Sequence, residues 1–161
     1  MDNNLKRTII MEHYQNPKNK GLIEDSSYGF VNMNNESCID EINLLVKIKD
    51  DKIVDIRFDG EACAICTSAT SIMIETLIGK TKKEALEILK NYEYMIDEKE
   101  YNSDILEQAI VYSDIAHQPN RKKCALLSWW GIKKALKGEY DERKIWVMWI
   151  TNMSIWTCKF K

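Results

Sequence analysis

The sequence predicts an α+β fold, with a small three-stranded antiparallel sheet and helices packed on one face of it. Apolar and polar residues alternate over 42–48, the turn residues "DDK" follow, and residues 53–58 resume an extended pattern, which together predict a β-hairpin. Capped and amphipathic segments dominate the chain after this hairpin. Because 161 residues with 45% hydrophobic content can bury one sizeable core, we expect one main domain.

The first half of the chain supplies one helix and the sheet. Apolar residues recur at helical spacing over 5–15, and the Pro and Gly residues of "NPKNKG" at 16–21 end that helix. A loop rich in Ser, Gly and Asn follows. Residues 28–33 are expected to form a third strand beside the hairpin at 40–62. Without this third strand, the hairpin would depend on helix packing for its stability.

The second half of the chain is expected to be helical. One helix begins near Cys63 and stops at Gly79, and Thr81 then opens a second helix to about residue 94 with a capping box. Ser103 is a candidate cap for a third helix over "DILEQAIVYSDIA". After the break at "HQPNRKK", the segment "CALLSWWGIKKALKG" forms the last helix.

Charge and hydropathy narrow the classes of function. The 23 basic and 25 acidic residues give a net charge of −2, so we expect neither a nucleic-acid nor a membrane partner. The N-terminus lacks the uninterrupted apolar run of a signal peptide, and no later run is long enough to span a bilayer. We therefore expect a cytoplasmic protein, whose specificity resides in a local site.

Five cysteines carry the strongest chemical signal in the composition. Their odd number, and the reducing cytoplasm, argue against a disulfide framework and favour metal binding or sulfur chemistry. Cys38 lies at the entrance to the hairpin, Cys63 at its exit into a helix, and Cys124 near the start of the last helix. Such element ends can converge on one point. Asp40, two residues from Cys38 and so on the same side of an extended chain, adds a fourth ligand.

Three thiolates and one carboxylate can surround Zn²⁺ or hold iron in a cluster. The carboxylate corner binds iron in a cluster more weakly than sulfur would, which favours exchange over permanent storage, although zinc sites with carboxylates also exist. The spacing of Cys38, Cys63 and Cys124 does not form the paired knuckles of a zinc ribbon. The residues alone therefore leave both metals open.

Five segments together resemble the U-type iron–sulfur cluster assembly proteins, the family of IscU, the NifU N-terminal domain and SufU. The resemblance covers about residues 5–138. It is carried by "HYQNPKNKG" at 13–21, "NESCID" at 35–40, "FDGEACAICTSATSIM" at 58–73, "GKTKKEAL" at 79–86 and "RKKCALLSWWGIKKAL" at 121–136. The extra segment at 97–118, and Lys123 where the IscU branch usually has His, are similar to the SufU branch, as is Arg121.

This resemblance implies a site and a function. Cys38, Asp40, Cys63 and Cys124 would bind Zn²⁺ or, transiently, an iron–sulfur cluster, and Cys124 would be the catalytic thiol. The partners would be a PLP-dependent cysteine desulfurase, which donates sulfur, and apo iron–sulfur proteins, which receive the product. The chain would be a scaffold or sulfur acceptor more than a conventional enzyme.

The chain departs from the family pattern at two positions. Ile39 stands where the family usually has Gly between the first Cys and the Asp, so the backbone freedom of Gly is lost beside Cys38. Cys66 lies where many relatives have Ser, and it forms a Cys-x-x-Cys pair with Cys63. A resolving thiol is one interpretation of Cys66, but we favour a packed bystander.

Other residues with metal-binding or docking chemistry receive more ordinary interpretations. His13 and His117 are too isolated to form a metal cluster, and Cys158 is assigned no role. Of the pair Trp129 and Trp130, one ring is expected to point into the core and the other sideways, with partner docking as an alternative for the outer ring. Arg121 and Lys123 are either ordinary surface charges or cations that favour the Cys124 thiolate.

Three functional hypotheses follow. The first is an iron–sulfur cluster assembly protein that accepts sulfur and holds metal or a nascent cluster. The second is a zinc-dependent sulfurtransferase that works with the desulfurase, and the third is a non-catalytic zinc-stabilised interaction module. All three place the assembly domain at 1–138 and leave 139–161 as a C-terminal tail whose structure the sequence does not predict.

Overall fold

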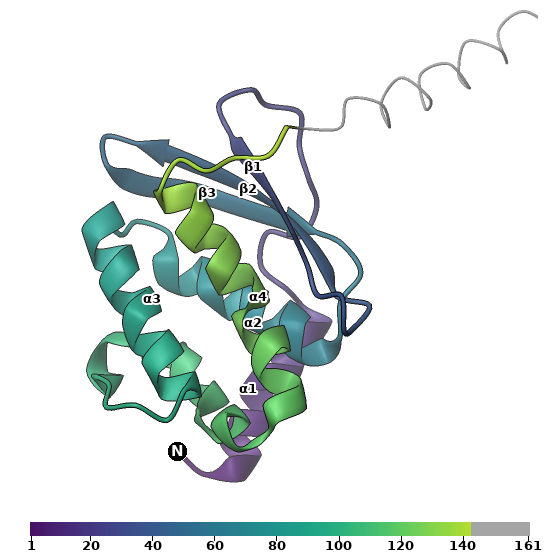
Figure 1. Cartoon of the computed structure of the whole chain (residues 1–161), viewed down its shortest axis with the longest axis vertical. Helices are drawn as coiled ribbons and strands as arrows, with labels where there is room; N and C mark the ends of the chain where they lie inside the picture. Colours follow the sequence, from purple (N-terminus) through teal and green to yellow (C-terminus); the bar gives the residue numbers. More distant parts are fainter. Residues whose placement is uncertain (143–161) are drawn as a thin grey trace, which may run out of the picture.

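The computed structural model describes residues 1–142 and confirms the α+β fold (Figure 1). The chain forms a three-stranded antiparallel sheet in the order β1-β2-β3, and the described residues also form four α-helices and two 3₁₀ helices. The strands are β1 (Gly29–Asn34), β2 (Glu41–Lys49) and β3 (Lys52–Asp59). The α-helices are α1 (Asn3–Gln15), α2 (Ala64–Leu77), α3 (Lys82–Ile96) and α4 (Pro119–Leu136). The predicted tail at 139–161 lies largely outside the described residues.

The predicted hairpin and third strand are both present. β2 pairs with β3 across the turn at Asp50 and Asp51, both of which have positive φ, and β1 pairs with the other edge of β2. The connections β1–β2 and β2–β3 therefore lie at opposite ends of the sheet. Figure 1 shows the helices gathered on one side of the sheet, with α4 running across it.

Local sequence explains where the helices begin. The predicted capping box of α3 is confirmed, because the Thr81 hydroxyl accepts from the Glu84 backbone N–H and the Glu84 carboxylate accepts from the Thr81 backbone N–H. Helix α4 opens with Pro119 at a position where no backbone donor is needed. Within residues 1–142, no helix is both long enough and apolar enough to cross a membrane.

The segment between α3 and α4 differs from its prediction. Instead of one α-helix capped by Ser103, it forms the 3₁₀ helices η1 (Ser103–Ile105) and η2 (Glu107–His117). The cap of η1 is Asn102, whose side chain accepts from the Asp104 backbone N–H. Glu107 has a φ of +49°, which is a left-handed backbone that a continuous α-helix cannot contain. The prediction of a single helix was therefore wrong.

The core fixes α4 against the rest of the molecule. Trp129 is fully buried and stacks on Tyr92 with ring centroids 4.0 Å apart, whereas Trp130 is half-buried, as predicted for this pair. Gly131 lets α4 approach the sheet closely, because a Cβ there would lie 2.6 Å from Cδ1 of Leu44 and 2.9 Å from Cγ of Met33. Since α4 carries Cys124, this packing also positions that cysteine.

The connection from β3 to α2 is held against the start of β2. Gly60 has a φ of +139°, and the Glu41 backbone N–H donates to the Glu61 carbonyl at 2.8 Å. This bond joins the residue after Asp40 to a residue just before Cys63. A Cβ at Gly60 would collide with the backbone carbonyl oxygen of Glu41.

Gly60→Ala is expected to destabilise the protein by about 2–4 kcal/mol, because it combines a glycine-only backbone conformation with a backbone clash. Denaturant unfolding with equal metal content measures this loss. Gly79→Ala is the matched control, since Gly79 also has positive φ, at +86°, but no heavy atom lies within 4 Å of the place that its methyl group would occupy. Equal losses in the two variants would show that the contact with Glu41 carries no cost.

Candidate metal centre

Cys38 and Asp40 lie in the connection between β1 and β2, at the end of the sheet nearest the start of α2. The Asn35 backbone N–H donates to the Asp40 carbonyl at 2.9 Å, and the Cys38 backbone N–H donates to the Asn35 carbonyl at 3.0 Å. These bonds close a compact turn. The two residues therefore meet through a turn, and the extended chain assumed from their i, i+2 spacing was the wrong local geometry.

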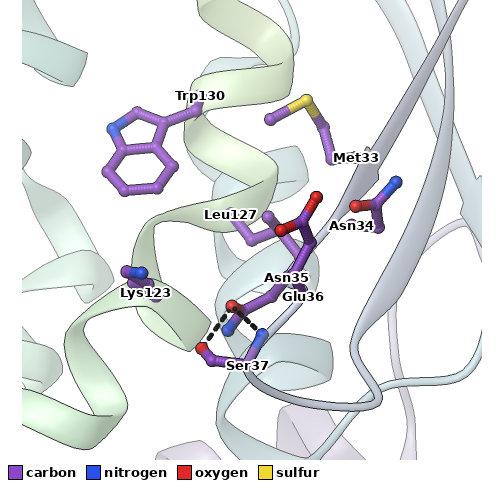
Figure 2. A pocket seen from close by; sticks show the side chains of 8 residues that line it. All are labelled: Met33, Asn34, Asn35, Glu36, Ser37, Lys123, Leu127 and Trp130. Atoms are coloured by element: carbon purple, nitrogen blue, oxygen red, sulfur yellow. Dashed lines mark hydrogen bonds between the residues drawn. The ribbon is translucent and has the colours of Figure 1, made fainter.

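Asn35 organises this turn, and sequence reasoning missed it. Its side-chain oxygen accepts from the Ser37 backbone N–H at 3.3 Å and from the Ser37 hydroxyl at 2.7 Å, both of which Figure 2 draws. The Asn-x-Ser spacing is the available signal, because Asn side chains favour such turns by bonding to the backbone two residues on.

Ile39 fits this turn without strain. It is not among the residues with positive φ, so the turn closes without the freedom that Gly would give at this position. Its side chain is 78% exposed, between Cys38 and Asp40 in the chain.

Cys63 is the N-cap of α2 and is tied to Asp40. Its sulfur accepts from the Cys66 backbone N–H at 3.4 Å, and its own backbone N–H donates to Oδ1 of Asp40 at 2.7 Å. The Cys63 thiol lies 3.7 Å from Oδ2 of the same carboxylate. Asp40 is 1% exposed, so these bonds are shielded from water.

Cys124 reaches the same point from the second turn of α4. Sγ of Cys38, a carboxylate oxygen of Asp40 and Sγ of Cys124 all lie within 4.8 Å of one another. Cys63 is outside this group of three and joins it through Asp40. Tetrahedral zinc with sulfur at about 2.3 Å and oxygen at about 2.0 Å requires ligand atoms roughly 3.5–3.8 Å apart, so the three grouped atoms lie within about 1.3 Å of that spacing.

The electrostatics of the centre favour a cation. Burial raises the pKa of the Cys124 thiol, and its hydrogen bond to Asp40 and the charge of Cys63 raise it further. Within residues 1–142, Asp40 forms no ion pair that would neutralise it. The buried Cys124 thiol and Asp40 carboxylate must therefore carry protons or lie beside a positive ion, and the donor set of thiols and one carboxylate suits zinc or iron.

Cys66 lies outside the group of converging ligands. It is fully buried. Burial is the main cause that raises the pKa of its thiol, and the neighbouring negative groups raise it further. Because the thiolate is the reactive form, this environment opposes a resolving role. The structure shows Cys66 packed in the core, and its lack of a chemical role stays a prediction.

The other polar candidates are accounted for by ordinary contacts. His13 is buried, with its ring nitrogens 2.8 Å from the Ser71 hydroxyl and 3.0 Å from Oε1 of Gln108, and His117 pairs with Glu98. Neither histidine belongs to the group of metal-binding side chains found in residues 1–142. Cys158 lies outside the described residues.

A groove opens between the Asn35 turn and α4. It has a volume of about 540 Å³ and is lined by Met33, Asn34, Asn35, Glu36, Ser37, Lys123, Leu127 and Trp130. Figure 2 shows the groove residues of α4 facing those of the turn across it. Lys123 and Arg121 are exposed, and among the described residues neither forms an ion pair. The pKa of Cys124 is raised, so these cations do not offset its burial.

Comparison with known protein families gives a match over most of the chain. The NifU-like N-terminal domain matches residues 5–145.

Curated relatives carry two kinds of functional name. The chain is 38% identical over 136 residues to the zinc-dependent sulfurtransferase SufU of Bacillus subtilis, a match that covers 84% of this chain and 91% of that protein. It is 35% identical to the iron–sulfur cluster assembly scaffold protein IscU of Streptococcus pyogenes, with 84% of each chain covered.

Solved structures share the fold. The crystal structure of FiSufU from Fervidobacterium islandicum, described as a putative iron–sulfur cluster assembly scaffold protein for the SUF system, matches with a TM-score of 0.76 and 41% identity. The match covers 80% of this chain and 93% of that one. The N-terminal part of a nitrogen-fixing NifU-like protein from Brucella abortus, at 19% identity and a TM-score of 0.71, shows the same fold over 81% of this chain and 91% of that one.

Proposed function

The chain belongs to the NifU-like N-terminal domain family, and we propose that it acts in iron–sulfur cluster assembly. In this role it accepts sulfur from a PLP-dependent cysteine desulfurase and holds metal or a nascent cluster for transfer to apo iron–sulfur proteins. The observation that carries the proposal is the convergence of Cys38, Asp40 and Cys124 at one point. The assembly domain spans 1–138, and its place is the cytoplasm, where thiols stay reduced.

The proposed ligands are Cys38, Asp40, Cys63 and Cys124. Support comes from the 3.7 Å between Sγ of Cys63 and Oδ2 of Asp40, which matches the spacing of neighbouring ligands in a tetrahedral shell. A zinc ion bound there would supply the positive charge that keeps these thiols deprotonated.

Cys124 is the proposed sulfur acceptor. Its thiolate attacks the terminal sulfur of the persulfide on the desulfurase, a new S–S bond forms at Cys124, and the S–S bond of the donor breaks. The donor cysteine leaves as a thiolate, and the transferred sulfur now belongs to a Cys124 persulfide. The step needs no external oxidant or reductant, because one S–S bond replaces another.

The second candidate function is that of a zinc-dependent sulfurtransferase, in which zinc stays in place and only sulfur moves on. The 38% identity to the protein of that name favours it. The third, a zinc-stabilised interaction module, retains the metal but passes on no sulfur.

Two measurements test these proposals together. Protein purified anaerobically is expected to contain about one metal site per chain, and adding it to a purified cysteine desulfurase is expected to raise turnover at least about tenfold. Iron with sulfide supports the cluster-holding form, and stoichiometric zinc without iron supports the sulfurtransferase. A metal-loaded chain that leaves desulfurase turnover unchanged would leave only the interaction module.

A further inference from the structure

Access to the candidate metal centre is restricted to one side. Cys124 is 5% exposed and Asp40 is 1% exposed, whereas Cys38 and Ile39 stand on the surface. Ile39 is 78% exposed, more than any other large apolar side chain in residues 1–142. Ile39 therefore lies on the open side of the centre, between two proposed ligands in the chain, while the Cys124 and Asp40 side chains are closed to water.

The chemistry of sulfur transfer brings the donor against this surface. Two cysteines joined by a disulfide have Cα atoms about 4.4–6.8 Å apart, and a persulfide adds one further S–S bond of about 2 Å. The backbone of the donor must therefore come within roughly one side-chain length of the turn that carries Cys38. Any donor that reaches Cys124 must make contact with the neighbouring exposed residues.

The groove offers a continuation of that contact. It is lined by the end of β1, the turn at 35–40 and helix α4, and the last two of these also carry residues of the centre (Figure 2). Met33, Leu127 and Trp130 give it apolar walls, and the exposed side chains of Glu36 and Lys123 add one charge of each sign. Neither charge forms an ion pair with another described residue, so both are available to a partner.

We propose that Ile39 and this groove form the docking surface for the cysteine-bearing segment of the sulfur donor, with Ile39 as a specificity-determining contact. The inference rests on the proposed function, and it assigns recognition of the sulfur donor to particular residues of this chain. An exposed isoleucine gains most when it enters an apolar recess, so the donor is a desulfurase whose persulfide is flanked by such a recess. The groove then binds the donor's polypeptide on one side of the persulfide, and charged residues of the donor pair with Lys123 and Glu36 of this protein.

The test titrates a purified cysteine desulfurase from the same organism with the full-length, zinc-loaded chain. The readouts are the half-saturating concentration, the maximal turnover and the zinc content. Ile39→Asp is expected to raise the half-saturating concentration about tenfold and Ile39→Gly about threefold, with maximal turnover and zinc content unchanged. Val54→Asp is the control, because Val54 is 46% exposed on β3 near the opposite end of the sheet.

A second pair of variants tests the groove. Lys123→Glu is expected to raise the half-saturating concentration about fivefold and to change its dependence on salt, whereas Lys83→Glu, on the exposed face of α3, leaves both unchanged.

The outcomes separate this inference from the proposed function. If the wild-type chain accelerates the desulfurase but both Ile39 variants saturate at the wild-type concentration, the docking surface is overturned and the function stands. If Ile39 variants lower maximal turnover at unchanged half-saturation, the residue shapes the chemistry and the docking role is equally overturned. A wild-type chain that accelerates no desulfurase overturns both proposals.

Discussion

Cys124→Ser is expected to lower sulfur acceptance from the desulfurase at least about a hundredfold, since a serine hydroxyl is a far weaker nucleophile than a thiolate. The variant is also expected to lose stable metal binding, because it removes one of three thiolates from a site that holds the ion chiefly through sulfur. Transfer of ³⁵S from labelled cysteine, with metal analysis of the same sample, measures both losses.

Cys66→Ser provides the matched control for this prediction. Cys66 is fully buried beside the centre but is not among the converging ligand atoms, so its replacement should retain both metal and sulfur acceptance. Its cost is expected in stability alone, at about 1–2 kcal/mol for a buried hydroxyl in place of a thiol. Sulfur acceptance by Cys124→Ser at the wild-type rate would remove Cys124 from the mechanism.

Asp40→Ala is expected to retain metal but to slow the hand-over of sulfur or cluster by about tenfold or more. Water can take the coordination position of the carboxylate while three thiolates hold the ion. Loss of Asp40 therefore leaves metal bound, whereas loss of one of the cysteines is expected to release it. If the carboxylate assists departure, a bound cluster should persist longer in the variant. The effect is measured as the rate at which an apo iron–sulfur protein receives the cluster, monitored by the absorbance of the recipient.

The structure adds a second consequence of this substitution. Oδ1 of Asp40 accepts the backbone N–H of Cys63, so alanine leaves that donor without its partner, at a cost of about 1–3 kcal/mol. Asp40→Asn separates the two roles, because its amide oxygen can still accept this bond while the charge is lost. Wild-type hand-over in a folded, metal-loaded Asp40→Ala variant would make the carboxylate a bystander.

Local sequence patterns correctly predicted the helices and strands that are determined by neighbouring residues in the chain. Alternating residues specified the hairpin, and the Thr81–Glu84 pair specified the start of α3. The segment at 103–117 was mispredicted because the left-handed backbone at Glu107 interrupts it, and apolar spacing carries no information about one such residue.

The candidate site was predicted through residue types and resemblance more than through geometry. The meeting of Cys38 with Asp40 was expected from strand spacing, yet it depends on the turn organised by Asn35. The groove beside Trp130 could not be predicted at all, because it depends on how closely α4 approaches β1. Such distances arise from tertiary packing, which a single sequence does not display.

The position of Cys63 at the head of α2 has a consequence for the charge around the centre. Its sulfur accepts a hydrogen bond from the Cys66 backbone N–H, and its own backbone N–H donates to Asp40. The start of a helix carries a partial positive charge, and here that charge is directed at a sulfur atom. The backbone of α2 therefore favours negative charge on sulfur at this point, independently of any charged side chain.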